Sequence, residues 1–140
     1  MPAQGPSVIT DLLAQASRLS NQQLSERLRP TGLSVDSWRI LTLLRGSDGM
    51  SMGGLAEGLV VNNPTLTKMV DRMVNDNLVY RVPDPNDRRK VLICVTDLGH
   101  KIHGNAQQIV MGHQTQIDQS YQDSRELSDL LLKFIREFRS

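Results

Sequence analysis

The sequence predicts a mostly α-helical chain with one small β-hairpin. Apolar residues recur at helical spacing through most of the 140 residues, and strand-forming residues are confined to two short runs, 78–82 and 90–95. With 39% hydrophobic residues, a chain of this length can bury the core of a single domain. Aromatic residues make up only 4% of the chain, so the core must consist mainly of Leu, Ile, Val and Met side chains.

Two helices are predicted in the first third of the chain. Residues 1–6 are expected to form a loose tail. Residues 7–28 follow an amphipathic helical pattern that ends before Pro30, because the residue preceding a proline disfavours helical geometry. Ser34 is a suitable N-cap for the second helix, which ends before the loop 46–49.

A short glycine-rich helix is predicted over 53–60. It follows residues 50–52, which can add a short third strand to the hairpin. Gly53, Gly54 and Gly58 each cost about 1 kcal/mol relative to alanine in a helix interior. We therefore expect this helix to be the least stable element.

The next helix begins at Asn63, a favourable N-cap, and Pro64 suits its first turn. One face carries an apolar stripe: Leu66, Met69, Val70 and Met73. Another face carries polar and cationic side chains: Thr65, Lys68 and Arg72. Because Lys68 and Arg72 repel each other weakly, that face does not stabilise the helix by itself, and a phosphate backbone would relieve the repulsion.

A charged hairpin follows this helix. Asn77 suits the left-handed position that ends a helix. The two strand-like runs then flank the loop 83–89, which is rich in turn residues and has a basic tip. Thr96 is a suitable N-cap for a long helix that continues to about Tyr121.

Several segments together carry a resemblance to a known family. They are residues 32–41, Leu55-Ala56, residues 63–77, Asp87-Arg88-Arg89 and residues 95–99. In this order and spacing they are similar to the winged helix-turn-helix of the MarR family of bacterial transcription regulators. The wing signature of that family, Asp-x-Arg, matches Asp87 and Arg89. The resemblance covers nearly the whole chain.

The resemblance implies a single MarR-type chain, 1–140, with a winged helix-turn-helix over 34–99 and dimerisation helices over 7–30 and 100–140. The last helix carries a wide apolar stripe: Leu127, Leu130, Leu131, Phe134, Ile135 and Phe138. A second copy of the chain is expected to cover this stripe, the alternative being the chain's own first helix. A homodimer would bind a pseudo-palindromic duplex with half-sites about 10 bp apart.

The resemblance also assigns the contacts to double-stranded DNA. The residues on the major-groove side are Asn62, Asn63, Thr65, Thr67, Lys68 and Arg72. Asn and Thr side chains can hydrogen-bond base edges, whereas Lys68 and Arg72 suit phosphates. Arg89, with Arg88 beside it, is expected at the minor groove, where Asp87 orients the guanidinium by an ion pair. The alternative is a solvated helix face and a solvated turn.

Members of the family commonly release DNA when a small aromatic or phenolic acid enters a cleft between the dimerisation helices and the winged region. By this analogy, Trp38 can stack on an aromatic ring and Arg39 can pair with a carboxylate. The alternative is that Trp38 belongs to the core and Arg39 to the surface.

Two other sensing schemes are open. Cys94, the only cysteine, permits a redox-responsive regulator, although a strand cysteine without a second cysteine is more often a buried filler. His100 and His103 are three residues apart on one helix, with His113 further along, but two histidines alone make a poor metal site. We therefore predict no metal and no cofactor.

Motifs and charge exclude other classes of protein. The sequence has no glycine-rich phosphate loop, nucleophile elbow or Cys/His metal set, so an enzyme is not expected. The formal net charge is only +1, so DNA affinity must come from local patches. No run approaches the roughly 20 apolar residues that cross a bilayer, and no secretory signal is present, so a cytoplasmic protein is expected.

Together these patterns and the resemblance predict a sequence-specific, DNA-binding regulator of transcription. The resemblance implies a repressor that is released by a small aromatic or phenolic effector. The competing interpretation is a winged helix used for protein interaction. An acidic or apolar recognition face would favour that alternative, whereas the face predicted here is polar and cationic.

Overall fold

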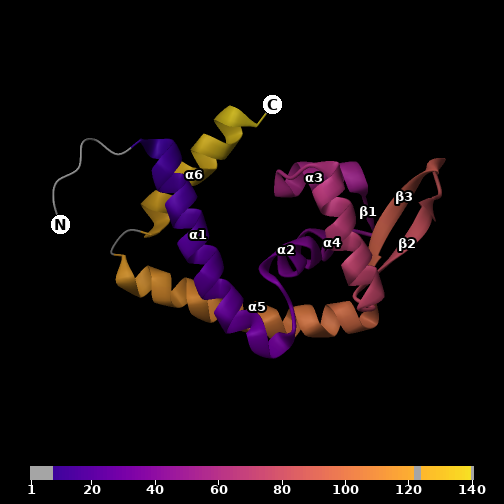
Figure 1. Cartoon of the computed structure of the whole chain (residues 1–140), viewed down its shortest axis with the longest axis horizontal. Helices are drawn as coiled ribbons and strands as arrows, with labels where there is room; N and C mark the ends of the chain where they lie inside the picture. Colours follow the sequence, from indigo (N-terminus) through magenta and orange to yellow (C-terminus); the bar gives the residue numbers. More distant parts are fainter. Residues whose placement is uncertain (1–7, 122–123, 140) are drawn as a thin grey trace.

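The structure, a computed structural model, describes residues 8–121 and 124–139. The predicted tail 1–6 lies outside the described residues, and so does Asp123, where the sequence predicts a break between the last two helices. Its elements are α1 (Ile9–Leu28), the 3₁₀ helix η1 (Arg29–Thr31), α2 (Val35–Leu44), β1 (Met50–Ser51), α3 (Met52–Leu59), α4 (Asn63–Asn75), β2 (Val79–Asp84), β3 (Asp87–Val95), α5 (Asp97–Ser120) and α6 (Ser124–Phe138). Figure 1 shows two lobes: the winged lobe, with α2, α3, α4 and the hairpin, and the terminal lobe, with α1 and α6. The long α5 joins the two lobes. The predicted mostly α fold with a small β-wing is confirmed.

The hydrophobic core lies mainly in the winged lobe. The largest fully buried side chains are Leu28, Ile40, Leu41, Leu44, Leu55, Leu66, Met73, Ile93, Val70 and Val79. On α4, Leu66, Val70 and Met73 recur at helical spacing and are completely buried, as predicted. Burying each such side chain contributes about 1.5–3 kcal/mol. This burial fixes α4 with its polar face outward.

The three strands form an antiparallel sheet in the order β1-β3-β2. Met50 pairs with Ile93, which confirms the predicted third strand. The hairpin is longer than predicted: β2 continues to Asp84 and β3 begins at Asp87, so only residues 85–86 join them. The extension is possible because β2 is the edge strand, where a proline removes no hydrogen bond to another strand.

Helix α3 forms despite its three glycines and begins and ends one residue earlier than predicted. The Ser51 hydroxyl oxygen accepts a hydrogen bond from the Gly54 N–H at 3.0 Å and caps the helix. A Cβ at Gly58 would lie 3.0 Å from Cδ1 of Leu43. Gly58 therefore allows α3 to pack closely on α2.

The start of α5 is fixed against the end of α4. Thr96 caps α5 by accepting a hydrogen bond from the Gly99 N–H at 2.9 Å, and its hydroxyl donates to the Asn77 carbonyl oxygen at 2.7 Å. Asn77 has a positive φ of 60°, as predicted for the end of α4. A Cβ at Gly99 would lie 2.2 Å from the Leu78 carbonyl oxygen, so only glycine permits this close approach.

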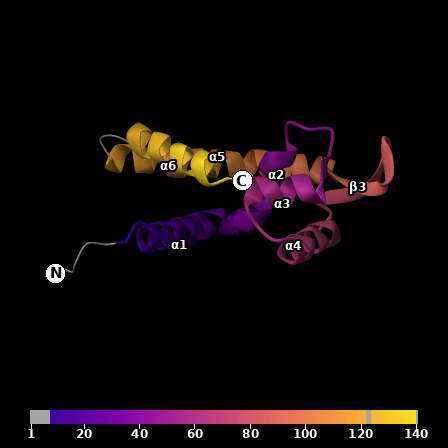
Figure 2. The same ribbon diagram turned by 90° about the horizontal axis from the view of Figure 1, so that it is seen from above.

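The terminal lobe has little core of its own. Within its described residues α6 has no buried side chain, and the six side chains of its predicted stripe are 38–71% exposed. On α1, Leu24 and Leu28 are buried, whereas Ile9 and Leu12 near its N-terminus are exposed. Figure 2 shows α1 diverging from α5 towards that end. The stripe on α6 is therefore not covered by the chain's own first helix.

Candidate DNA-binding surface

Helix α4 is capped by Asn62 rather than by Asn63. Asn62 has an extended backbone (φ −79°, ψ 159°), and its Oδ1 accepts a hydrogen bond from the Thr65 N–H at 2.9 Å. Asn63 is already helical, and Pro64 follows in the first turn. The predicted cap was wrong by one residue because both asparagines suit an N-cap and proline is tolerated throughout the first turn.

One face of α4 is exposed and carries polar and cationic side chains: Asn63, Thr65, Thr67, Lys68 and Arg72. The Thr67 hydroxyl donates to the Asn63 carbonyl oxygen at 2.9 Å, which leaves its oxygen able to accept a further hydrogen bond. Lys68 and Arg72 form no ion pair with any residue that the structure describes. Their charges are therefore available to an anionic partner.

This face continues into a groove of about 300 Å³ between α4 and the N-terminus of α2. Its lining residues are Ser34, Asp36, Ser37, Pro64, Thr65, Lys68, Met69 and Arg72. Ser34 caps α2, as predicted, by accepting a hydrogen bond from the Ser37 N–H at 3.0 Å. Sequence reasoning missed the groove because its two walls come from separate helices whose packing no local pattern specifies.

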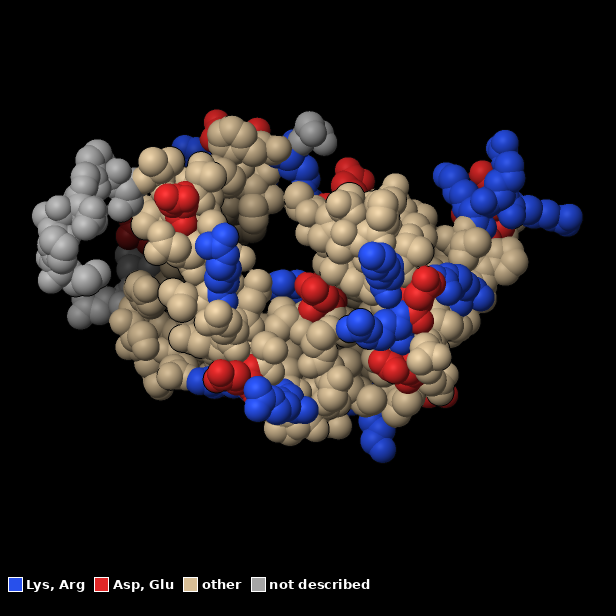
Figure 3. All heavy atoms as spheres, in the orientation of Figure 1, with Lys and Arg blue, Asp and Glu red and all other residues tan. Residues whose placement is uncertain are grey.

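The wing tip presents two arginines to solvent. The side chain of Arg89 is 92% exposed, and Arg88 beside it is also exposed. Oδ1 of Asp87 accepts a hydrogen bond from the Arg89 N–H at 3.1 Å and lies 3.4 Å from Nε of the same residue, so the predicted ion pair is present. Figure 3 shows basic side chains gathered around the wing tip, at the upper right.

An ion pair joins the root of the wing to α4. Arg81 of β2 donates to Oδ1 of Asp71 on α4, and both side chains are partly exposed. An exposed pair of this kind contributes about 0.2–1 kcal/mol. It also neutralises a carboxylate on the helix that carries the cationic face.

The turn between α3 and α4 contains a strained residue. Val60 lies in the left-handed region (φ 57°, ψ 52°), and the residue is 75% exposed. A β-branched side chain rarely adopts this conformation, which costs on the order of 1–3 kcal/mol. Hydrogen bonds from the N–H groups of Val60 and Val61 to the last turn of α3 hold it in place. This turn sets the path of the chain into Asn62 and α4.

Trp38 and Arg39 lie side by side on α2. Arg39 donates to Oδ1 of Asn21 on α1 at 2.8 Å, and its guanidinium lies 3.8 Å from Asp36. Trp38 is half-buried against the core, and its Nε1 is buried without a hydrogen-bond partner in the described part of the chain. Neither residue lines the groove between α4 and α2 or the cleft that separates α1 from α6.

Cys94 and two of the histidines are engaged by protein atoms. Sγ of Cys94 lies 3.6 Å from a backbone carbonyl oxygen. Nε2 of His103 lies 3.0 Å from Oγ1 of Thr42, and Nε2 of His113 lies 3.3 Å from Oε1 of Gln23. Burial lowers the pKa of both histidines, and a nearby arginine lowers each further.

Residues 8–121 and 124–139 contain neither a candidate metal site nor a candidate membrane-spanning helix. No group of three or more His, Cys, Asp and Glu side chains is placed to hold a metal ion. No helix combines the length and the apolar character needed to cross a membrane.

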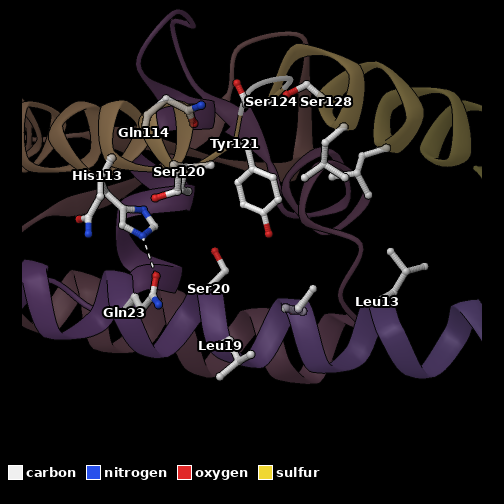
Figure 4. A pocket seen from close by; sticks show the side chains of 16 residues that line it. Leu13, Leu19, Ser20, Gln23, His113, Gln114, Ser120, Tyr121, Ser124 and Ser128 are labelled. Carbon is white, nitrogen blue, oxygen red and sulfur yellow. Dashed lines mark hydrogen bonds between the residues drawn. The ribbon is translucent and has the colours of Figure 1, made fainter. Parts of the chain in front are cut away.

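A second cleft, which sequence reasoning did not identify, separates α1 from α5 and α6. It encloses about 740 Å³ and has apolar walls that include Leu13, Leu127 and Leu131. Figure 4 shows the ring of Tyr121 directed across it towards α1, beside the His113–Gln23 hydrogen bond. The two walls belong to opposite ends of the sequence, so only the folded chain brings them together.

Comparison with known proteins identifies relatives over nearly the whole chain. The sequence profile of the MarR family matches residues 33–91. The homoprotocatechuate degradative operon repressor of Escherichia coli is 30% identical over 129 residues, which cover 91% of this chain and 87% of that protein.

Solved structures share the fold. A crystal structure of a mutant MarR from Escherichia coli complexed with operator DNA is 26% identical with a TM-score of 0.81, and the match covers 91% of this chain and 92% of that one. The transcriptional regulator BldR from Sulfolobus solfataricus has a TM-score of 0.85 at 24% identity, covering 93% of this chain and 94% of that one.

These relatives are regulators of transcription rather than enzymes, and one of them is solved on operator DNA. The matched region contains the capped α4, its apolar stripe and the Asp87–Arg89 wing tip. The chain belongs to the MarR family of DNA-binding transcription regulators.

Proposed function

We propose that the protein is a homodimeric repressor that binds a pseudo-palindromic operator and releases it when a small aromatic or phenolic acid binds. The observation that carries this proposal is the exposed cationic face of α4, whose Lys68 and Arg72 have no ionic partner in the described residues. The E. coli relative named as the repressor of a homoprotocatechuate degradative operon supports both repression and an aromatic effector.

Helix α4 would enter the major groove, which is wide enough to admit an α-helix. Asn63, Thr65 and Thr67 are exposed there and can hydrogen-bond base edges, while Lys68 and Arg72 hold phosphates. Oδ1 of Asn62 is engaged in capping, so its side chain would contact DNA through the Nδ2 donor. Specificity would therefore come from neutral side chains and most of the affinity from charged ones.

The wing would reach the adjacent minor groove. The side chain of Arg89 is 92% exposed and contacts Asp87, and both features suit insertion of a guanidinium into a narrow, A·T-rich groove. Arg88 would neutralise a neighbouring phosphate. The Asp71–Arg81 ion pair would keep the wing at a fixed angle to α4 while both are bound.

A second copy of the chain would complete the terminal lobe. The cleft between α1 and α6 and the exposed leucines of α6, among them Leu127, Leu130 and Leu131, offer a large apolar surface that one chain leaves open. In this proposal residues 7–30 and 100–140 dimerise and residues 34–99 read DNA. Linking two binding units makes the second contact effectively intramolecular, which can raise affinity by about 10²–10⁴-fold.

We propose that Trp38 and Arg39 contact the effector, at a position near α1. Nε1 of Trp38 has no hydrogen-bond partner among the described residues and is a donor that a phenolic or carboxylate oxygen could satisfy. Arg39 could exchange Asn21 for a carboxylate. Release of DNA would then follow from movement of α2 relative to α1.

The test is selection of bound duplexes from a random pool by the full chain, followed by competition with small aromatic acids. We expect a pseudo-palindrome with half-sites about 10 bp apart. Lys68→Gln should weaken binding to the selected duplex, and Arg18→Gln, a charge removal on exposed α1, should not. Enrichment of a single asymmetric half-site, or of no duplex at low salt, would overturn the proposal.

A further inference from the structure

Two polar atoms are buried in the region where α2 packs on α5, and neither is hydrogen-bonded within residues 8–121 and 124–139. They are Nε1 of Trp38, on α2, and Oε1 of Gln107, on α5. A buried donor or acceptor without a partner costs more free energy than a typical hydrogen bond contributes. We therefore expect each atom to be paired in the folded protein.

The helices α2 and α5 run in opposite directions where they pack. Near the C-terminal end of α2, Oγ1 of Thr42 lies 3.0 Å from Nε2 of His103. Further back on α2, Arg39 contacts Asn21 of α1, and the same turn of α1 contacts His113 of α5. Going backwards along α2 therefore corresponds to going forwards along α5.

This packing brings Trp38 and Gln107 to the same level. Trp38 precedes Thr42 by one helical turn, and Gln107 follows His103 by one helical turn. Residues one turn apart lie on the same face of a helix and about 6 Å apart along its axis. Because the helices are antiparallel, both side chains lie one turn beyond the Thr42–His103 contact and on the facing sides of α2 and α5.

The two atoms need an occupant that can both accept and donate. The indole N–H of Trp38 only donates, and Oε1 of Gln107 only accepts. A carboxylate only accepts and an ammonium only donates, so neither group satisfies both atoms. A water molecule does both, and buried waters in proteins commonly bridge polar groups that have no other partner.

We propose that one buried water molecule bridges α2 and α5, accepting a hydrogen bond from Nε1 of Trp38 and donating one to Oε1 of Gln107. With the Thr42–His103 contact, this water forms a polar layer that joins the winged lobe to the long helix. The site does not depend on the proposed function. An effector bound at Trp38 would displace this water.

The first experiment observes the water from the indole. Trp38 is the only tryptophan, so its indole N–H gives a single NMR signal. In the full chain without DNA, water-selective nuclear Overhauser spectra should show a cross-peak between this proton and a water molecule that tumbles with the protein. Gln107→Met, which keeps the side-chain length and removes the acceptor, should lose the cross-peak and shift the tryptophan emission to shorter wavelength. Gln108→Met, at the exposed neighbouring position, is the matched control and should change neither.

The second experiment is a double-mutant cycle that asks whether the two atoms share one partner. Trp38→Phe and Gln107→Met should each lower the midpoint of urea unfolding. The double variant should lower it by less than the sum of the two losses, because the same water is lost in each. Additive losses would show that the two atoms are independent and would refute the bridge.

The wild-type protein alone can also refute the inference. An indole proton without a water cross-peak, or a crystal structure in which Trp38 and Gln107 bond directly, would exclude the water. A cross-peak that persists in Gln107→Met would remove Gln107 from the site. None of these measurements uses DNA or an effector, so their failure would leave the proposed function intact, and failure of the duplex selection would leave the water site intact.

Discussion

The winged lobe and the terminal lobe differ in how much of their apolar surface the chain itself buries. The winged lobe closes a core of aliphatic and methionine side chains from α2, α3, α4 and the sheet. The terminal lobe leaves its largest apolar stripe, on α6, open to solvent. A helix with such a face is normally stabilised by packing rather than by propensity. In our proposal one lobe folds within a single chain and the other is completed by association with a second copy.

The sharpest test of this contrast is a pair of truncations in the two lobes. Met73→Ala, at a fully buried position of α4, should lower the free energy of unfolding by about 2–5 kcal/mol. Leu132→Ala, on α6, should change it by less than about 0.5 kcal/mol, because Leu132 is exposed and lies off the apolar stripe. Urea denaturation followed by circular dichroism measures both. Similar losses in the two variants would contradict the division into a closed and an open lobe.

A charge placed on the α6 stripe should separate folding from association. Leu131→Glu should yield a folded monomer in analytical ultracentrifugation and lower the affinity for a two-site operator by about 100-fold. Lys133→Glu, on the same helix but off the stripe, is the control and should remain a dimer. A Leu131→Glu protein that stays dimeric would locate the interface elsewhere.

Truncation at the wing tip should affect DNA binding and leave association unchanged. Arg89→Ala should weaken binding about tenfold on every duplex, or roughly 1.4 kcal/mol, and reduce the slope of log K against log salt by about one. Arg18→Ala, on α1, is the matched charge control. Anisotropy titrations across a salt series measure both quantities, and an unchanged slope would remove Arg89 from the interface.

The smallest expected effect concerns the contact between α5 and the winged lobe at His103. The Thr42 hydroxyl donates to the Trp38 carbonyl oxygen at 2.8 Å, so it can only accept from His103, whose Nε2 must carry a proton. Burial lowers the pKa of His103, and Arg45 and His100 lower it further. The folded state thus favours the neutral ring, and the unfolded state binds more protons below the ordinary value of 6.5.

Stability that depends on His103 should therefore be complete above pH 6.5 and should be lost as the pH falls towards the lowered folded-state pKa. His103→Gln should flatten this part of the stability profile, and His100→Gln, which removes only the smallest of the three causes of the shift, should flatten it less. Thermal unfolding between pH 5 and pH 8 measures the difference. His113, which has the same direction of shift, will leave a residual slope in the variant.

Local patterns predicted the parts of the fold that local chemistry controls. The caps at Ser34 and Thr96, the left-handed Asn77 and the stripe on α4 follow from residue type and spacing, and all are present. The choice between Asn62 and Asn63 was not predictable, because both satisfy the same local rule. The length of the hairpin also escaped prediction, since it depends on which strand lies at the sheet edge.

The clefts and the histidine contacts could not be predicted, because they join distant parts of the chain. His103 meets a residue 61 positions away, and His113 meets one 90 positions away. The arginines at the wing tip were recognised from a short motif, but the cleft that Phe138 and Arg139 line has no motif. It follows only from where the C-terminal end of α6 lies relative to the α3–α4 turn.

The close contact at Gly99 couples the orientation of α5 to that of α4, so that α5 acts as a rigid lever arm. Its 24 residues extend about 36 Å, and its first turn is seated on the backbone that closes α4. A lever of this length turns a tilt of one degree at one end into a displacement of about 0.6 Å at the other. In the proposed dimer, we therefore expect the distance between the two winged lobes on DNA to depend on the angle at which the second copy packs against the C-terminal end of α5.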